Sequence, residues 1–292
     1  MFFGGVEMGG TKMVCAIIDD NNNIIDKTTI DTTSPKETLL KIVDFFKEKD
    51  IVSLGLGSFG PIDLNVNSKT YGYITESPKL DWRNTDIVGY FKNHFNIPIG
   101  FDTDVNAACL GEVMYGAGKG FNNVIYGTIG TGIGFGIYLN GQLHHGLMHP
   151  ETGHMILRNR EDDKYEGCCP YHKCCFEGLA SGTSMKERWG IPAEEMNKND
   201  KAFELEAYYI AQGLVNCVMS YSPEKIILGG GVMHNEKLFP LIRKELLKQL
   251  AGYIAKDEII KDIDNYVVEP LLNDNQGIIG ACELGRCMLK HE

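Results

Sequence analysis

Soft metal ligands crowd together in the middle of the chain. Cys169, His172 and Cys175 have the spacing C-x2-H-x2-C, and His154 lies a short segment upstream. Two thiolates and two imidazoles form a common ligand set for a tetrahedral zinc ion, and an ion whose four positions are all filled by protein is structural rather than catalytic. The sequence therefore predicts a structural zinc site at these four residues.

Two glycine- and threonine-rich turns could bind phosphate. They are Gly9-Gly10-Thr11-Lys12 and Gly130-Thr131-Gly132, each between two predicted strands. Glycine lets backbone N–H groups converge on an anion, and the threonine hydroxyl adds a donor. The first turn is not a Walker A loop, because the apolar strand 13–18 follows it instead of a helix. Either turn alone is compatible with an ordinary hairpin, but the pair, together with Gly229-Gly230-Gly231, favours phosphate binding.

Three carboxylates lie where chemistry could use them. Asp104 stands between a predicted strand and a predicted helix, which would fix its position as a general base for phosphoryl transfer; the alternative is a helix cap. Glu151 and Glu177 flank the metal ligands and could accept protons from the hydroxyls of a sugar. The alternative for Glu177 is a solvated charge in the first turn of a helix.

The elements that would position these groups form a pattern that occurs twice. Strands joined by a glycine turn are followed by helix–strand units, which predicts two related α/β lobes with a cleft between them. The glycine-rich stretch 116–120 separates lobes at 1–119 and 120–292, with an irregular zinc segment at about 148–177. The C-terminal helix can pack back on the first lobe. Strands are predicted at 2–8, 13–18, 24–30, 51–56, 97–101, 124–129, 133–139, 225–228 and 266–268, and helices after Ser34, at 85–95, 104–115, 201–221 and 238–253, and from Gln276.

Composition narrows the class of protein. The 292 residues are 43% hydrophobic and carry a net charge of −11, which argues against a nucleic-acid-binding surface. No apolar run approaches the roughly 20 residues of a membrane-spanning helix, and the first residues lack the pattern of a signal peptide. Four of the nine cysteines are adjacent pairs, Cys168-Cys169 and Cys174-Cys175, which suit metal binding in a reducing cytoplasm; Cys168 or Cys174 could replace a neighbour as ligand.

These motifs, in this order, resemble those of the ROK sugar kinases. The resemblance covers nearly the whole chain and rests on 7–12, 102–108, 130–132, 149–154, the zinc knot and 227–233. It implies the two-lobed hexokinase/actin-like (ribonuclease H-like) fold, with an inserted zinc-binding segment. Glu7, the run Ser58-Phe59-Gly60-Pro61-Ile62-Asp63 and the Cys-Pro-Tyr-His form of the knot are similar to the bacterial zinc-containing fructokinases.

The resemblance also assigns roles to individual residues. Asp104 would be the catalytic base, Cys175 is preferred as the last zinc ligand because Cys-x-Glu is the family pattern, and Glu7 would hold Mg²⁺ through water. ATP would be the co-substrate, and a homodimer is expected by analogy. Sugar contacts would come from Gly60, Thr103, Asp104, Glu151, His154 and Glu177. Nucleotide contacts would come from Glu7, Gly9, Gly10, Thr11, Lys12, Gly130, Thr131, Gly132, Thr183, Gly229, Gly230, Gly231, Val232 and Met233.

The implied reaction is ATP-dependent phosphorylation of D-fructose to D-fructose 6-phosphate. Thr103 replaces the asparagine that precedes the base in many glucokinases of the family, which favours fructose over an aldopyranose. Glucokinase, mannokinase and N-acetylhexosamine kinase remain alternatives on the same scaffold, and a sugar-binding regulator without activity is a third. A sugar-responsive repressor is disfavoured by the acidic charge and by the early position of the first glycine turn.

Overall fold

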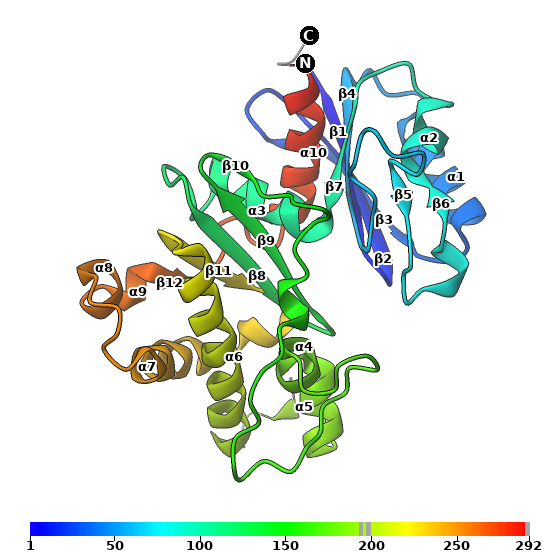
Figure 1. Cartoon of the computed structure of the whole chain (residues 1–292). Coiled ribbons are helices and arrows are strands. Elements are labelled where there is room, and N and C mark those ends of the chain that lie inside the picture. Colours follow the sequence, from blue (N-terminus) through cyan, green and yellow to red (C-terminus); the bar gives the residue numbers. More distant parts are fainter. Residues whose placement is uncertain (193–194, 197–199, 290–292) are drawn as a thin grey trace. The chain divides into compact units, whose positions relative to one another are not determined.

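The computed structural model describes residues 1–192, 195–196 and 200–289, and its contacts group into two compact units (Figure 1). Unit 1 comprises Met1–Lys119, Leu143–Pro150 and the described residues from Leu271 onward; unit 2 comprises Gly120–Gln142 and the described part of Glu151–Pro270. The segment Leu143–Pro150, placed by the sequence in the second lobe, thus has its contacts in unit 1. His145 and His149 make these contacts, with Asp102 and with the backbone of Ile62.

Unit 1 is built on a five-stranded mixed sheet. The strand order is β3 (Ile24–Asp31), β2 (Lys12–Ile18), β1 (Phe3–Met8), β4 (Ser53–Ser58) and β7 (Ile99–Thr103). Strand β2 pairs antiparallel with both β3 and β1, whereas β4 pairs parallel with β1 and β7 parallel with β4. Because β1, β4 and β7 end at the same edge of the sheet, the residues that follow them are brought together there.

Helices cover both faces of this sheet. Helix α1 (Pro35–Phe46) starts as predicted: Ser34 is the N-cap, Pro35 occupies the first turn, and Leu39, Ile42, Val43 and Phe46 are buried. It shares a hydrophobic core with α2 (Ile87–Lys92) and the sheet. The helix predicted at 85–95 is shorter, because Asp86 ends the short strand β6 (Thr85–Asp86) and caps α2 through the Gly89 N–H. Strand β6 pairs with β5 (Tyr73–Ile74), and a 3₁₀ turn spans Leu80–Trp82.

The other face carries α3 (Asp104–Tyr115) and α10 (Gln276–Met288), the red helix of Figure 1. Helix α10 crosses the sheet almost backbone to backbone: a Cβ at Gly55 would lie 1.7 Å from the carbonyl oxygen of Ala281. Only glycine permits that approach, so the glycines in strands that otherwise read as apolar mark the docking face of the C-terminal helix.

Unit 2 contains a second five-stranded sheet, ordered β10 (Gln142–Leu143), β9 (Ile133–Leu139), β8 (Val124–Ile129), β11 (Lys225–Gly229) and β12 (Val267–Val268). Strands β8 and β9 form the predicted antiparallel pair, and β11 adds parallel to β8. Asn140 and Gly141 both have positive φ, as their two-residue hairpin turn requires. The helices are α4 (Phe176–Ala180), α5 (Gly182–Trp189), α6 (Asp200–Tyr221), α7 (Leu238–Leu250), α8 (Asp257–Ile260) and α9 (Ile263–Tyr266), with 3₁₀ turns at Thr152–His154 and Gly231–His234.

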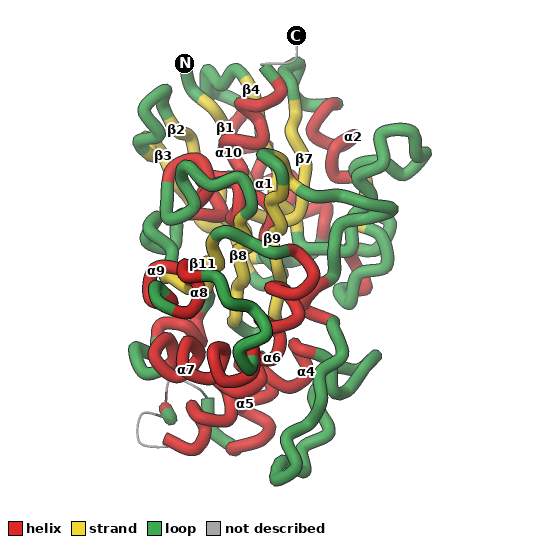
Figure 2. The backbone as a smooth tube through the Cα atoms, turned by 60° about the vertical axis from the view of Figure 1, so that its left-hand side comes forward, coloured by secondary structure: helices red, strands yellow, loops and turns green. Residues whose placement is uncertain are grey.

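Helices α6 and α7 lie side by side and share the core of unit 2 with the sheet (Figure 2). The sequence missed α4 and α5, because they are short and follow the irregular metal-ligand segment without a clear apolar period. No helix within the described residues combines the length and apolar character needed to cross a membrane.

One carboxyl group inside unit 2 is fully buried with no hydrogen-bond partner among the described residues. Glu206 on α6 is 0% exposed, and neither carboxylate oxygen has a hydrogen-bond partner among the described residues. Burial raises the pKa of Glu206 well above its ordinary value of 4.5, although Arg188 opposes the shift. The folded protein therefore binds this proton more tightly than the unfolded chain. The contribution of the protonated Glu206 to the free energy of unfolding is complete below about pH 4.5, and it is lost as the pH rises.

We expect Glu206→Gln to raise the melting temperature at neutral and alkaline pH and to change it little at acidic pH. The glutamine amide is neutral at every pH. The variant therefore avoids the free-energy cost of keeping a buried carboxyl protonated, or of ionising it, as the pH rises. Melting temperatures of wild type and variant across this pH range test the expectation. Glu204→Gln, an exposed position on the same helix, is the matched control, and equal effects of the two substitutions would contradict the assignment.

Candidate active site and metal centre

The start of α3 presents Asp104. Its cap is Thr103, whose Oγ1 accepts the Asn106 N–H at 3.1 Å, so Asp104 does not serve as the N-cap. The Asp104 carboxylate accepts the neighbouring Val105 N–H at 2.9 Å. Burial raises the pKa of Asp104 to about 6. A carboxylate poised near neutrality, at the end of a strand and the start of a helix, has the properties of a general base.

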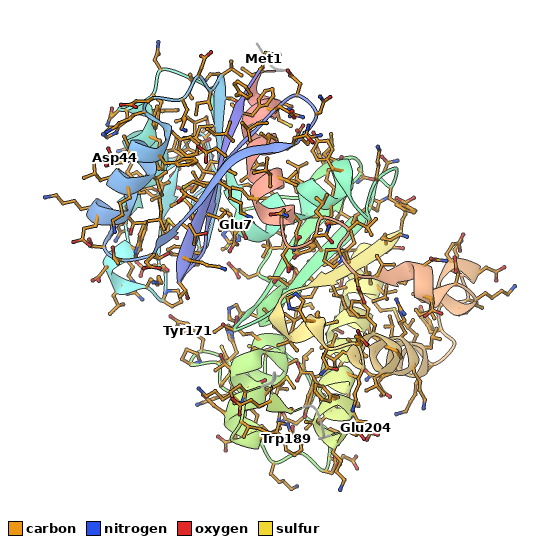
Figure 3. The ribbon with its side chains drawn as sticks, turned by 180° about the vertical axis from the view of Figure 1, so that it is seen from behind. Met1, Glu7, Asp44, Tyr171, Trp189 and Glu204 are labelled. Carbon is orange, nitrogen blue, oxygen red and sulfur yellow. The ribbon has the colours of Figure 1, made fainter. Side chains whose placement is uncertain are left out.

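Glu7, labelled in Figure 3, is a second carboxylate of unit 1 with a raised pKa. Burial, followed by the negative charge of Asp104, raises the pKa of Glu7 to about 7. Its carboxylate packs against Gly277 in the first turn of α10, where a Cβ would lie 2.5 Å from Glu7 Oε1. Two neighbouring carboxylates that resist ionisation together suit a divalent cation with oxygen ligands, such as Mg²⁺.

The first glycine turn closes the hairpin between β1 and β2. Gly9 N–H donates to the Lys12 carbonyl at 3.1 Å, and Thr32 holds the turn from the end of β3 through the Gly9 carbonyl at 2.8 Å and the Thr11 carbonyl at 3.0 Å. The side chains of Thr11 and Lys12 are exposed. The backbone is thus fixed while the hydroxyl and ammonium groups stay free to meet an anion.

Gly60 lies in the loop after β4. The ring of His149 packs against it, and the Ile62 N–H donates to His149 Nε2 at 3.2 Å. His149 is buried, and burial lowers its pKa, in keeping with a neutral ring that accepts at Nε2. This contact, which no local sequence pattern predicts, fixes the loop that carries Gly60.

The second glycine turn is held by the start of α5. Gly182 N–H donates to the Gly130 carbonyl at 2.7 Å, and Thr183 Oγ1 donates to the Thr131 carbonyl at 2.7 Å. Thr183 therefore touches the turn with which the sequence grouped it. Gly132 lies against the carboxylate of Glu177, since a Cβ there would be 2.6 Å from Glu177 Oε2.

The glycine run after β11 lies close to the same turn. Gly230 has φ +93° and leaves no room for a side chain, because a Cβ would be 2.5 Å from the Ile129 carbonyl oxygen. Val232 and Met233 are buried in the core of unit 2, so any contact they make with a nucleotide is through the backbone. In unit 2 the stretches Gly130–Gly132 and Gly229–Gly231 thus lie close together, and their glycines have no side chains to cover the backbone.

Glu177 is not a solvated helix charge. Its Oε2 accepts the Ile133 N–H at 3.0 Å, which joins the first turn of α4 to the strand after the second glycine turn. Glu151 is exposed at the start of the 3₁₀ turn Thr152–His154, where its carbonyl accepts the His154 N–H at 2.9 Å. Glu177, Glu151 and His154 therefore all lie in unit 2, near the metal ligands or the turn.

The ligand atoms of His154, Cys169, His172 and Cys175 all lie within 4.8 Å of one another. His154 Nδ1 is 3.7 Å from Cys169 Sγ and 3.5 Å from Cys175 Sγ, and Cys169 Sγ is 3.8 Å from His172 Nδ1. A tetrahedral ion with Zn–N and Zn–S bonds of ordinary length separates N from S by about 3.5 Å and S from S by about 3.8 Å. The set therefore fits zinc.

Neither spare cysteine belongs to this set. Cys168 Sγ instead lies 3.7 Å from Ser181 Oγ, and Cys174 is absent from the group of possible ligands among the described residues. Tyr171, labelled in Figure 3, is exposed beside His172 at the outer edge of the segment. Because His154 offers Nδ1 to the cluster, its Nε2 remains for another partner.

Sequence reasoning left out one network beside Asp104. Asp102 Oδ1 accepts the Thr103 N–H and the Asn106 Nδ2–H, each at 2.7 Å, and Asp102 Oδ2 lies 2.8 Å from His145 Nε2. The sequence signal was the polar pattern Asp102-x-Asp104-x-Asn106. Nothing local linked that pattern to His145.

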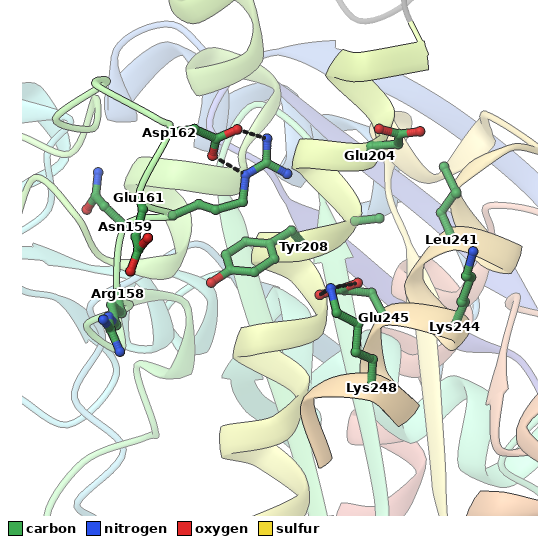
Figure 4. Close-up of a pocket in the computed structure, with 12 residues that line it drawn as sticks. Arg158, Asn159, Glu161, Asp162, Glu204, Tyr208, Leu241, Lys244, Glu245 and Lys248 are labelled. Atoms are coloured by element: carbon green, nitrogen blue, oxygen red, sulfur yellow. Dashed lines mark hydrogen bonds and ion pairs between the residues drawn. The ribbon is translucent and has the colours of Figure 1, made fainter. Parts of the chain in front are cut away.

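A separate hollow of about 1060 Å³ lies on unit 2 between the segment 158–162 and helices α6 and α7 (Figure 4). Its basic and acidic side chains are equal in number, and several neutralise one another, as in the pairs Arg160–Asp162 and Lys248–Glu245. The residues that line it include none of the predicted site residues, and its balanced charge favours no ligand class.

Comparison with known proteins gives the family of the chain. The fructokinase of Lactococcus lactis subsp. cremoris is 43% identical over 292 residues, covering 100% of this chain and 97% of that protein. The glucokinase of Halalkalibacterium halodurans is 27% identical over 326 residues, covering 96% and 93%. The crystal structure of a ROK hexokinase from Thermus thermophilus superposes with a TM-score of 0.82 at 23% identity, with 100% of both chains covered. The family model described as ROK family matches residues 3–286, and the chain belongs to the ROK family.

Proposed function

We propose that the protein is an ATP-dependent fructokinase that phosphorylates D-fructose to D-fructose 6-phosphate. The observation that carries the proposal is the full-length similarity to a fructokinase at 43% identity, against 27% for a glucokinase. The carboxylate of Asp104, with its raised pKa, and a glycine turn in each unit support a phosphoryl transfer, because such a reaction needs a base and donors for the phosphates.

Asp104 is the proposed general base. Phosphoryl transfer is mostly positioning and charge neutralisation, so the base has to orient the attacking hydroxyl and accept its proton late in the reaction. A pKa of about 6 leaves the Asp104 carboxylate ionised at neutral pH while keeping it basic enough for this role. Its location at the first position of α3, with Thr103 as the cap, supports the assignment.

The proposed sugar contacts are the side chains of Glu151, His154 and Glu177, with Gly60 and Thr103. Carboxylates accept two hydroxyl protons each, and His154 Nε2 stays available while Nδ1 faces the metal cluster. Glu177 Oε1 is the oxygen not used by the Ile133 N–H. Oriented acceptors of this kind suit a polyhydroxylated ligand.

The proposed nucleotide contacts are the two glycine turns with Thr183, the Gly229–Met233 backbone, and the Glu7 and Lys12 side chains. Glu7 would hold Mg²⁺, which supplies charge neutralisation for the ATP phosphates. The raised pKa of Glu7 supports this role, because an adjacent cation would stabilise its ionised form.

Zinc, if bound by His154, Cys169, His172 and Cys175, is structural, since four protein ligands leave no position for water. We further propose a homodimer working in the cytoplasm, where thiol ligands stay reduced. Glucose, mannose and N-acetylhexosamines are the alternative acceptors. A sugar-binding regulator is the second candidate, and absence of ADP release with any hexose would favour it.

We expect fructose to exceed glucose in kcat/KM by at least about 10-fold, because each polar group of the site that glucose leaves unpaired costs about 1–3 kcal/mol. Mannose should be the main secondary substrate. Thr103→Asn should narrow the gap by improving glucose use, since an amide offers a donor and an acceptor. A coupled ADP-release assay across a panel of hexoses measures all three expectations.

The control is Thr103→Ser, which keeps both the hydroxyl and the helix cap and should keep the preference. Asparagine is itself a good N-cap, so neither substitution removes the start of α3. If the wild type phosphorylates glucose as efficiently as fructose, the fructokinase assignment is wrong and a broader hexose kinase takes its place.

A further inference from the structure

The segment Leu143–Pro150 is fixed on unit 1 near its C-terminal end. His149 is 4% exposed and accepts the Ile62 N–H at 3.2 Å, so its ring is both buried and hydrogen-bonded. The neighbouring residues His144, His145, Gly146 and Leu147 are exposed, which makes His149 the anchor of the segment. Through this anchor the chain brings His145 to the strand that ends just before Asp104.

His145 completes the hydrogen bonding of a buried carboxylate. The Asp102 side chain is 5% exposed, and its Oδ1 already accepts two hydrogen bonds, from the Thr103 N–H and Asn106 Nδ2. Oδ2 faces His145 Nε2 at 2.8 Å. Because a carboxylate only accepts, the ring must carry its proton on Nε2. Asn106 Nδ2, which already donates to Oδ1, lies 3.4 Å from the same ring nitrogen.

Two hydrogen-bond partners of Asp102 lie on either side of the proposed base along the chain. Thr103 caps α3, Asp104 is the first residue of the helix, and Asn106 lies in its first turn. Residues at both ends of that turn, Thr103 and Asn106, therefore donate hydrogen bonds to Asp102 Oδ1. His145 is the hydrogen-bond partner of Asp102 Oδ2, and this contact limits rotation of the Asp102 carboxylate about the Cβ–Cγ bond.

We propose that His145 is a positioning residue for the phosphoryl transfer: acting through Asp102, it fixes the turn that presents Asp104 to the sugar hydroxyl. This assignment rests on the proposed function. The hydrogen bonds of His145 within the described residues are to Asp102 and Asn106, and not to Asp104. The His145 side chain is 35% exposed, so it contributes little to the core, and its effect is on geometry rather than on folding. Small displacements of a catalytic group are costly, since about 1 Å of misplacement can lower a rate by about 100-fold.

His145 and Asp102 also line a hollow of about 560 Å³ in unit 1, together with Tyr71 and Asp63. A direct contact between His145 and the sugar is therefore the competing interpretation. The two differ in kinetics: loss of a positioning residue lowers kcat, whereas loss of a sugar contact made equally in ground and transition states raises the sugar KM and leaves kcat unchanged.

The test compares His145→Ala, His145→Gln and His144→Ala. We expect His145→Ala to lower kcat by about 10–100-fold with little change in sugar KM or melting temperature. Glutamine can place an N–H near the position of Nε2, so His145→Gln should recover most of the rate. His144→Ala, the adjacent exposed histidine, should behave as wild type.

Amide hydrogen exchange supplies a readout that does not depend on activity. His145→Ala should speed exchange at the Thr103 N–H and Asn106 N–H, and His145→Gln should restore protection. Unchanged kcat and exchange in His145→Ala, a sugar-KM effect alone, or no recovery by glutamine would each overturn the proposal. A wild type that phosphorylates no hexose would refute the fructokinase assignment, while the exchange data would still decide whether His145 holds the turn.

Discussion

Asp104→Asn is expected to lower kcat by about 10²–10⁴-fold, with ATP affinity nearly unchanged. The loss of a general base typically costs this factor, because the amide cannot accept the proton of the attacking hydroxyl. The cap of α3 survives, since Thr103 Oγ1 and not Asp104 accepts the Asn106 N–H at 3.1 Å. Single-turnover rates, with ATP binding measured by calorimetry, separate the chemical step from nucleotide binding.

The pH dependence provides the control for this variant. Burial raises the pKa of Asp104 to about 6, so the wild-type rate should fall as the pH drops through that value and the base becomes protonated. The residual rate of Asp104→Asn should lack this acid limb. Asp81→Asn, at an exposed position of unit 1, should retain both the rate and the limb. Near-wild-type turnover in Asp104→Asn would remove Asp104 from the mechanism.

Cys169→Ser is expected to remove the bound metal and to raise the sugar KM more than the ATP KM. Cys169 is 1% exposed, and its Sγ lies within 3.8 Å of both histidine ligands. Without the ion the ring of His154, whose Nε2 is proposed to meet the sugar, loses the partner that orients its Nδ1. Structural zinc also stabilises the fold directly, so the melting temperature should fall as well. Metal analysis and steady-state kinetics measure the two effects.

Cys169 is a cleaner target than Cys175, because Cys175 Sγ also accepts the Gly178 N–H as the cap of α4. Cys174→Ser is the matched control, since Cys174 lies in the same segment but outside the ligand set. It should keep the metal and the sugar affinity. Protein purified without a chelator that contains no zinc would contradict the assignment, as would a Cys169→Ser variant that retains a full complement of the ion.

Structural features that depend on a few neighbouring residues were predictable from the sequence. Ser34-Pro35 starts α1 because capping and the fixed φ of proline act within one turn, and Asn140-Gly141 makes its hairpin for an equally local reason. The C-x2-H-x2-C spacing similarly places three ligands on one short loop, so only His154 had to be brought in from outside it. The resemblance to a family then supplied roles that spacing alone could not.

Tertiary structure decided which distant residues meet. His145 joins Asp102 across 43 positions, Glu177 joins Ile133 across 44, and Thr183 joins Thr131 across 52. Such contacts depend on where strands and helices pack, and a pattern of neighbouring residue types carries no information about that. The same reason explains why Leu143–Pro150 was assigned to the wrong group of contacts: its sequence continues a hairpin, but one buried histidine and one exposed histidine attach it to unit 1. The sequence therefore determined the candidate chemistry, and only the packing determined which side chains hold it in position.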